Sequence, residues 1–300
     1  MLFSLLRKLG SSLPFTKKTL SFFLNFLPNY IKVNHSKVAL YINPRDIKNL
    51  IDAIIPTENN NRMCELFSFL LDENHTVIDV GGNIGLFTIL AAKKAKKVYV
   101  FEPDPDCLEN IKKNITYYSL DNVILSNKAL SNEKGEKSFF KDDYYSTLGS
   151  FSKKNIDHNS QEFIIETVKL DDFVNSKKID GVDIIKLNIQ GAEGYAIEGG
   201  KELISRELPI ILIEFWPYGL ESTGYKPITL INFFKTLGYQ FTQFDQNTLD
   251  LQTKSIPDLE NMCLKFDRNS VSYFLLQNPN SRNFYKNLDE IISKKYNGIN

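Results

Sequence analysis

Cysteine and histidine are both scarce in this 300-residue chain, and the few that occur are far apart. Cys64, Cys107 and Cys263 form no CxxC pair, so they indicate neither a disulfide framework nor a zinc site. The three histidines form no HExxH or HxxxH motif, which argues against a zinc centre. We therefore expect partly buried thiols, a reducing compartment such as the cytoplasm, and no protein-bound metal.

The chain also lacks an excess of charge of either sign, because it has 36 basic and 36 acidic residues. Proteins that bind nucleic acid use clustered positive charge, so a nucleic-acid partner is not expected. Hydrophobic residues make up 42% of the chain, which is enough for the core of one large α/β domain or two small ones.

No hydrophobic run near the N-terminus is long enough to cross a membrane. The longest uncharged run there, residues 19–31, contains polar residues and a proline, whereas a span needs roughly 20 apolar residues. Its apolar residues on one helical face are Leu20, Phe23, Leu24 and Leu27. We expect a helix that packs on the main domain or on a partner. The alternative is a basic amphipathic helix, within residues 1–31, that lies on the inner face of a membrane.

Short apolar strands alternate with helices through the middle of the chain. The predicted strands are residues 77–80, 98–102, 123–127, 182–188 and 209–215, and the predicted helices are residues 63–71, 85–94, 105–117 and 192–205. Nearly continuous apolar strands are typical of a sheet that is covered on both faces. The order predicts a parallel, doubly wound α/β sheet.

Two alternating stretches, "KSFFKDD" and "QEFIIETVKL", interrupt this order and predict an inserted β-hairpin over residues 135–170. Residues 239–244 and 271–276 are expected to form the last two strands, in antiparallel orientation. We therefore divide the chain into an N-terminal helical segment (1–62), an α/β domain (63–277) and a polar C-terminal tail (278–300). The tail is expected to pack loosely, with one short helix around "LDEIISKKY".

A glycine-rich loop, "DVGGNIG" (residues 79–85), follows the first predicted strand, where open α/β sheets bind ligands. Its spacing is not the G-x-G-x-x-G that a dinucleotide's pyrophosphate requires. Asp79 is poorly placed beside a pyrophosphate but well placed for an ammonium group. Glu102, at the end of the next strand, can accept both hydroxyls of a ribose. These features describe S-adenosylmethionine better than NAD.

Five segments between residues 65 and 215 resemble, in order, the FkbM family of S-adenosylmethionine-dependent methyltransferases. They are "VIDVGGNIGLFT", "VYVFEPDPDCLENIKKN", "NKALSN", "VDIIKLNIQGAEGYAIEGGKELI" and "PIILIEF". The resemblance implies a Rossmann-like class I methyltransferase fold, with a mostly parallel sheet of seven strands and helices on both faces. It also implies O-methylation, frequently of a sugar hydroxyl in a glycan, a glycolipid or a secondary metabolite.

The resemblance also assigns cofactor-binding positions. Asp79, Gly81, Asn83 and Gly85 match the methionine-side loop, Glu102 and Pro103 match the ribose site, and Asn127 and Ala129 match the segment near the adenine. The family's K-I-D-V-E-G-x-E is replaced here by residues 186–193, in which Asn188 and Gln190 stand for the two inner acids. Both changes keep shape and remove charge. They argue against a divalent cation, because hard cations prefer carboxylates.

Methyl transfer to an aliphatic hydroxyl requires an acceptor held in line and a general base for its proton. The candidate bases are Glu193, Glu214 and, if the inserted loop folds over the site, His158, while Lys186 could lower the pKa of the acceptor. Glu193 is favoured because it keeps its charge between neutralised neighbours. Its alternative role is to stabilise the N-terminus of a helix.

Two other functions remain open from the sequence. One is a non-catalytic module that binds the cofactor or a partner in glycan assembly, with Asn188 and Gln190 as marks of lost chemistry. The other, which we favour least, is a nicotinamide-dependent oxidoreductase, and the chain contains no Tyr-x-x-x-Lys motif to support it.

Overall fold

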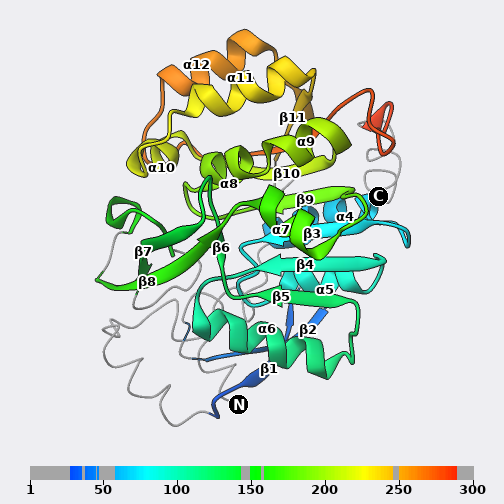
Figure 1. Cartoon of the computed structure of the whole chain (residues 1–300), viewed down its shortest axis with the longest axis vertical. Helices are drawn as coiled ribbons and strands as arrows, with labels where there is room; N and C mark the ends of the chain where they lie inside the picture. Colours follow the sequence, from blue (N-terminus) through cyan, green and yellow to red (C-terminus); the bar gives the residue numbers. More distant parts are fainter. Residues whose placement is uncertain are drawn as a thin grey trace.

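A mixed eight-stranded sheet forms the centre of the computed structural model, which describes residues 28–35, 38–44, 46, 58–142, 149–156, 159–245 and 250–288. The strand order is β12-β11-β13-β10-β9-β3-β4-β5 (Figure 1). The strands are β3 (Thr76–Val80), β4 (Lys97–Phe101), β5 (Val123–Ser126), β9 (Ile184–Leu187), β10 (Ile210–Phe215), β11 (Gln240–Phe244), β12 (Leu251–Thr253) and β13 (Ser272–Gln277).

Strands β10, β9, β3, β4 and β5 run parallel to one another, which confirms the doubly wound arrangement. β13 is antiparallel to both β10 and β11, as expected for the last two strands. The sheet has eight strands where we expected seven, because the short β12 pairs with the outer edge of β11. Three residues of mixed polarity carry too weak a pattern to be recognised as a strand.

Helices cover both faces of this sheet. α4 (Glu58–Leu70), α5 (Leu86–Ala92) and α6 (Pro105–Tyr117) lie on the face that carries Val77 and Leu212. The opposite face is covered by α7 (Leu170–Lys177), α8 (Glu193–Gly199), α9 (Lys201–Glu207), α11 (Pro227–Leu237) and α12 (Ile256–Leu264), while α10 (Pro217–Ser222) follows β10. Apolar residues thus bury both faces of the strands, and the loops at the carboxyl ends are left to bind ligands.

The helix predicted over residues 192–205 is two helices. α8 ends at Gly199 and α9 begins at Lys201, with Gly200 between them. A Cβ at Gly199 would lie 2.0 Å from the carbonyl oxygen of Ser131. Glycine at position 199 therefore lets the end of α8 lie close to the backbone of Ser131.

The predicted insertion is confirmed and belongs to a second, three-stranded sheet. β7 (Gly135–Asp142) and β8 (Ser160–Val168) pair in antiparallel orientation, and the short β6 (Ala129–Leu130) joins β8 in parallel. Figure 1 shows this sheet beside the central one.

The N-terminal segment is not uniformly helical as expected. Where the structure describes it, β1 (Ile31–His35) and β2 (Val38–Ile42) form an antiparallel hairpin. Val33, Leu40 and Ile42 point into a core shared with α5, because these stretches alternate with a period of two. The predicted amphipathic helix falls almost entirely on residues 1–27, outside the described residues, so its contact with a membrane stays a prediction. Within the described part, no helix has the length and apolar character to span a bilayer.

The start of the C-terminal tail is firmly packed, contrary to our expectation. Arg282 and Asn283 donate to the Asp183 carboxylate at 2.9 Å each, and the Thr76 amide donates to the same group at 2.8 Å. Leu288 is 5% exposed and joins the hydrophobic core. Buried polar groups need partners, so the polar composition here marks a bonded segment. The short helix predicted around "LDEIISKKY" lies mostly outside the described residues.

Asp183→Asn should lower the free energy of unfolding by about 1–3 kcal/mol, because it weakens a buried network of hydrogen bonds and one ion pair. Burial opposes ionisation, but the bonds from Thr76, Asn283 and Arg282 hold the pKa of Asp183 below its ordinary value. The contribution is therefore complete above the ordinary pKa of aspartate and is lost as the pH falls further.

Urea denaturation at pH 7 and at acidic pH measures this effect. Asp180→Asn, at an exposed neighbour, is the control and should change stability by less than about 0.5 kcal/mol. Equal losses in the two variants would contradict the role of Asp183.

Candidate functional site

The glycine loop between β3 and α5 is held in a conformation that requires glycine. Gly81 and Gly85 have φ values of 81° and 89°. A Cβ at Gly81 would lie 2.2 Å from the carbonyl oxygen of Asn188, which follows β9. The Gly81 amide donates to the carbonyl of Phe101 at 2.9 Å. The loop is thus fixed between β4 and β9, and both of these contacts are made by its main chain.

Glu102, directly after β4, holds two parts of this site together. Its Oε2 accepts the Asn83 amide at 2.8 Å, and its Oε1 accepts the Asp104 amide at 2.9 Å. The side chain is 6% exposed. Burial raises its pKa to about 7, although the two amides oppose the shift. Glu102 therefore titrates near neutral pH, next to the loop where a ribose is expected.

Asp79 lies inside the protein, at 0% exposure. Its Oδ2 accepts the Thr88 hydroxyl at 2.7 Å, and its Oδ1 lies 3.1 Å from the Lys186 ammonium. Lys186 directs hydrogen bonds to the carbonyl of Gly81 at 2.8 Å and, more weakly, to that of Val80 at 3.4 Å. The pair fastens the base of the glycine loop to β9. Direct contact of Asp79 with a ligand's ammonium group, and of Lys186 with an acceptor, stay predictions.

Glu193 closes the turn between β9 and α8. Its two carboxylate oxygens accept the amides of Ile189 at 2.8 Å and Gly191 at 2.9 Å, and the side chain is 1% exposed. Burial and the nearby charge of Glu214 raise its pKa to about 7. This geometry matches the alternative role given to Glu193, an acid at a helix N-terminus. Its role as a base stays a prediction.

The side-chain amide of Gln190 is a hydrogen-bond donor to Glu214, the second buried carboxylate near Glu193. Its Nε2 donates to Oδ1 of Asn188 at 3.0 Å and to Oε2 of Glu214 at 2.9 Å. The Tyr273 hydroxyl donates to the other oxygen of Glu214 at 2.9 Å, and burial raises the pKa of Glu214. Among the described residues, no group of three metal-ligating side chains occurs. Neutral side chains at 188 and 190 therefore form hydrogen bonds where acids would repel Glu214.

Of the other predicted site residues, two lie at the carboxyl edge of the central sheet, one lies in the inserted sheet and one is outside the described residues. Pro103 follows Glu102, and Asn127 is exposed directly after β5, so both lie at the carboxyl edge of the sheet. Ala129 is buried in β6, in a cluster with Phe139 and Ile165. His158 lies outside the described residues, so its approach to the site is untested.

Two residues that the sequence reasoning missed take part in the site. Tyr273 reaches Glu214 from β13, and Lys141 reaches Asp104 from β7, with its Nζ 2.9 Å from Oδ1. Burial opposes the charge on Lys141, yet Asp104 and Asp106 raise its pKa. The antiparallel register of the last strands was the only signal for Tyr273. Lys141 carried none, because no local motif links it to the start of α6.

The residues present fit S-adenosylmethionine. Glu102 accepts the Asn83 amide of the glycine loop and suits the diol of a ribose, whereas Asp79 is buried and paired with Lys186, so its contact with an ammonium group stays a prediction. Lys186, the ammonium beside them, is already paired with Asp79 and the loop carbonyls, so it offers little to a pyrophosphate.

Gly81→Ala should lower the free energy of unfolding by about 3 kcal/mol or more, because its Cβ would meet the Asn188 carbonyl in a left-handed conformation. Thermal denaturation measures the loss. Gly135→Ala is the matched control, since a Cβ there meets no atom within 4 Å. A Gly81→Ala protein as stable as this control would show that the loop does not pack against β9.

Two curated relatives and one solved structure are similar to parts of this chain. The 2-O-methyltransferase NoeI of Sinorhizobium fredii is 24% identical over 166 residues, which are 50% of this chain and 68% of NoeI. The hexuronic acid methyltransferase AglP of Haloferax volcanii is 26% identical over 128 residues, which are 43% of this chain and 51% of AglP. The crystal structure of methyltransferase FkbM from Methylobacillus flagellatus is 14% identical, with a TM-score of 0.42, and the match covers 75% of this chain and 52% of that one.

The family comparison covers the site itself. The profile described as "Methyltransferase FkbM domain" matches residues 79–241, more than half of the chain. The match begins at Asp79, contains the glycine loop, Glu102 and the 186–193 segment, and ends in β11. It confirms the resemblance and leaves the nicotinamide oxidoreductase unsupported. The chain therefore belongs to the FkbM family of methyltransferases, and S-adenosylmethionine is its methyl donor.

Proposed function

We propose that the chain transfers a methyl group from S-adenosylmethionine to a hydroxyl of a sugar, in a glycan, a glycolipid or a related metabolite. The observation that carries the proposal is a pair of buried carboxylates, Glu193 and Glu214, at the carboxyl edge of the sheet. Burial raises the pKa of both toward the range in which a general base works at neutral pH. The names of NoeI and AglP, a 2-O-methyltransferase and a hexuronic acid methyltransferase, support a sugar acceptor.

The donor, when bound, supplies an activated methyl group on a positively charged sulfur. The chain's own residues position the reactants and manage one proton. The glycine loop presents its main chain to the donor, Glu102 would accept the ribose hydroxyls, and Lys186 holds the loop in place. Glu193 or Glu214 would take the proton of the acceptor hydroxyl.

The two carboxylates can be separated by their contacts. Glu193→Gln places an amide NH2 against the backbone N–H of Ile189 or Gly191, so it should weaken the loop as well as the chemistry. Glu214→Gln retains an acceptor for Tyr273, and its NH2 faces the side-chain amide of Gln190, which can rotate to present its oxygen. If Glu214 is the base, this variant should lower kcat by about 10²–10⁴-fold while S-adenosylhomocysteine still binds.

The acceptor can be found with donor that carries a deuterated methyl group. Glycan and lipid extracts from cells that lack the gene are incubated with the purified protein and analysed by mass spectrometry. We expect the label on a sugar. Apart from its deuterium, the labelled product should match a species that occurs in cells with the gene and is one methylene heavier than its counterpart in cells without it. Label on a non-sugar product would contradict the sugar assignment and keep the methyltransferase.

The affinity for S-adenosylhomocysteine should fall about tenfold between pH 8 and pH 6, because protonation of Glu102 removes the acceptor for the ribose hydroxyls. The pKa of about 7 is raised, so the carboxylate is ionised only above neutral pH. The same group contributes most to folding stability below the ordinary pKa of glutamate, and that contribution is lost as the pH rises through about 7.

Calorimetric titration over this pH range tests the point. Glu102→Gln should bind more weakly and show little dependence on pH. Glu109→Gln, at an exposed glutamate paired with Lys112, is the control and should retain the full pH dependence. A wild-type affinity that is constant from pH 6 to pH 8 would remove Glu102 from the ribose site.

A further inference from the structure

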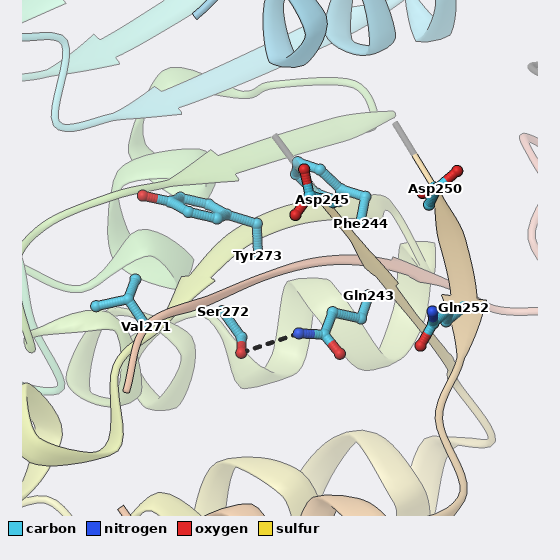
Figure 2. Close-up of a pocket in the computed structure, with 8 residues that line it drawn as sticks. All are labelled: Gln243, Phe244, Asp245, Asp250, Gln252, Val271, Ser272 and Tyr273. Atoms are coloured by element: carbon cyan, nitrogen blue, oxygen red, sulfur yellow. Dashed lines mark hydrogen bonds between the residues drawn. The ribbon is translucent and has the colours of Figure 1, made fainter. Parts of the chain in front are cut away.

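A polar pocket of about 390 Å³ opens where β11 ends and where β12 and β13 begin (Figure 2). Its volume is within the range of small-ligand pockets, roughly 300–1,000 Å³. The polar side chains that line it are Gln243, Asp245, Asp250, Gln252, Ser272 and Tyr273. The pocket lies outside the glycine loop and outside the 186–193 segment, so neither the family motifs nor the proposed reaction assigns it a role.

The pocket shares an edge of the sheet with the donor site. β13 runs antiparallel to β10, which places Tyr273 directly opposite Glu214 near the carboxyl end of β10. Tyr273 also pairs with Phe244, the last residue of β11. The pocket is therefore at the end of the sheet where the loops bind ligands.

Hydrogen bonds connect the pocket to Asn188, which packs against the glycine loop. Tyr273 donates to Glu214 at 2.9 Å, and Gln190 joins Glu214 to Asn188 at 2.9 Å and 3.0 Å. The Asn188 carbonyl in turn lies against Gly81. A ligand in the pocket would contact Tyr273, whose hydroxyl is hydrogen-bonded to Glu214, a candidate to accept the acceptor's proton.

The lining has the chemistry of a sugar subsite. Amide and hydroxyl groups can exchange hydrogen bonds with ring hydroxyls, as Gln243 and Ser272 already do with each other at 3.1 Å. Half-buried Tyr273, tilted against Phe244 at 5.9 Å between ring centroids, adds an aromatic surface. Asp245 and Asp250 contribute two carboxylates, and none of the lining residues described is basic. Two negative charges disfavour an anionic ligand and favour one with hydroxyl or ammonium donors.

We propose that this pocket is an acceptor subsite that takes a neutral or amino-bearing sugar ring and disfavours a hexuronic acid. The inference rests on the proposed function, since it assigns a class of sugar to an acceptor that is itself proposed. Tyr273 would be a positioning residue that relates the ring in the pocket to Glu214.

Ligand-observed saturation-transfer NMR on the full chain tests the subsite, with and without S-adenosylhomocysteine. The probes are methyl α-D-glucoside, methyl α-D-glucosaminide and methyl α-D-glucuronide. We expect saturation transfer to the first two, and an affinity about tenfold lower for the glucuronide, the size of one charge-assisted hydrogen bond lost or reversed. Asp250→Asn should reduce the preference for the glucosaminide over the glucuronide by a similar factor.

Asp121→Asn is the matched control, because Asp121 is an exposed aspartate before β5, at the opposite edge of the sheet. It should leave all probe signals unchanged, and thermal denaturation shows whether each variant is folded. The subsite is overturned if no probe binds, if the glucuronide binds as well as the others, or if Asp250→Asn behaves like the control. Each of these results leaves the proposed methyl transfer standing when S-adenosylhomocysteine binds. A wild-type chain that does not bind S-adenosylhomocysteine contradicts the methyl transfer, and with it the role of the pocket as an acceptor subsite, whatever the probe signals are.

Discussion

The contact between two main-chain segments, at Gly81 and Asn188, determines the geometry of the whole site. A side chain at position 81 would collide with the Asn188 carbonyl. The loop after β3 can therefore lie against the loop after β9 only if residue 81 is glycine. Lys186 reinforces the junction by binding the Gly81 carbonyl and the Asp79 carboxylate. The glycine loop and the loop after β9 are therefore held together, and Glu193 and Glu102 each bind one of these two loops.

A second constraint is the excess of buried acid at the carboxyl edge. Glu193 and Glu214 are both buried, and each carboxylate has to be matched by donors. Backbone amides serve Glu193, while Gln190 and Tyr273 serve Glu214. The amide at 190 thus has a structural reason that is independent of activity. The loss of charge that the sequence shows there is compatible with an active enzyme.

The sequence predicted those parts of the fold that hydrophobic periodicity and the positions of glycines determine. The parallel strands, the glycine loop, and Glu102 at a strand end follow from hydrophobic periodicity and from the position of glycines. The same patterns could not place Tyr273 or Lys141, because their partners are 59 and 37 positions away in the chain. The packed tail was missed for a similar reason, since Asp183 and Arg282 meet only after folding.

The ion pair between Lys141 in β7 and Asp104 before α6 links the inserted sheet to the residues around Glu102. Asp104 is 2% exposed, and it receives Lys141 from the insertion while its own amide holds Glu102. Replacing residues 135–168 with a stretch that has no lysine at position 141 would leave the buried Asp104 carboxylate without its cation, one hydrogen bond from Glu102. A chimaera of this chain that loses Lys141 from β7 must therefore also replace Asp104 before α6.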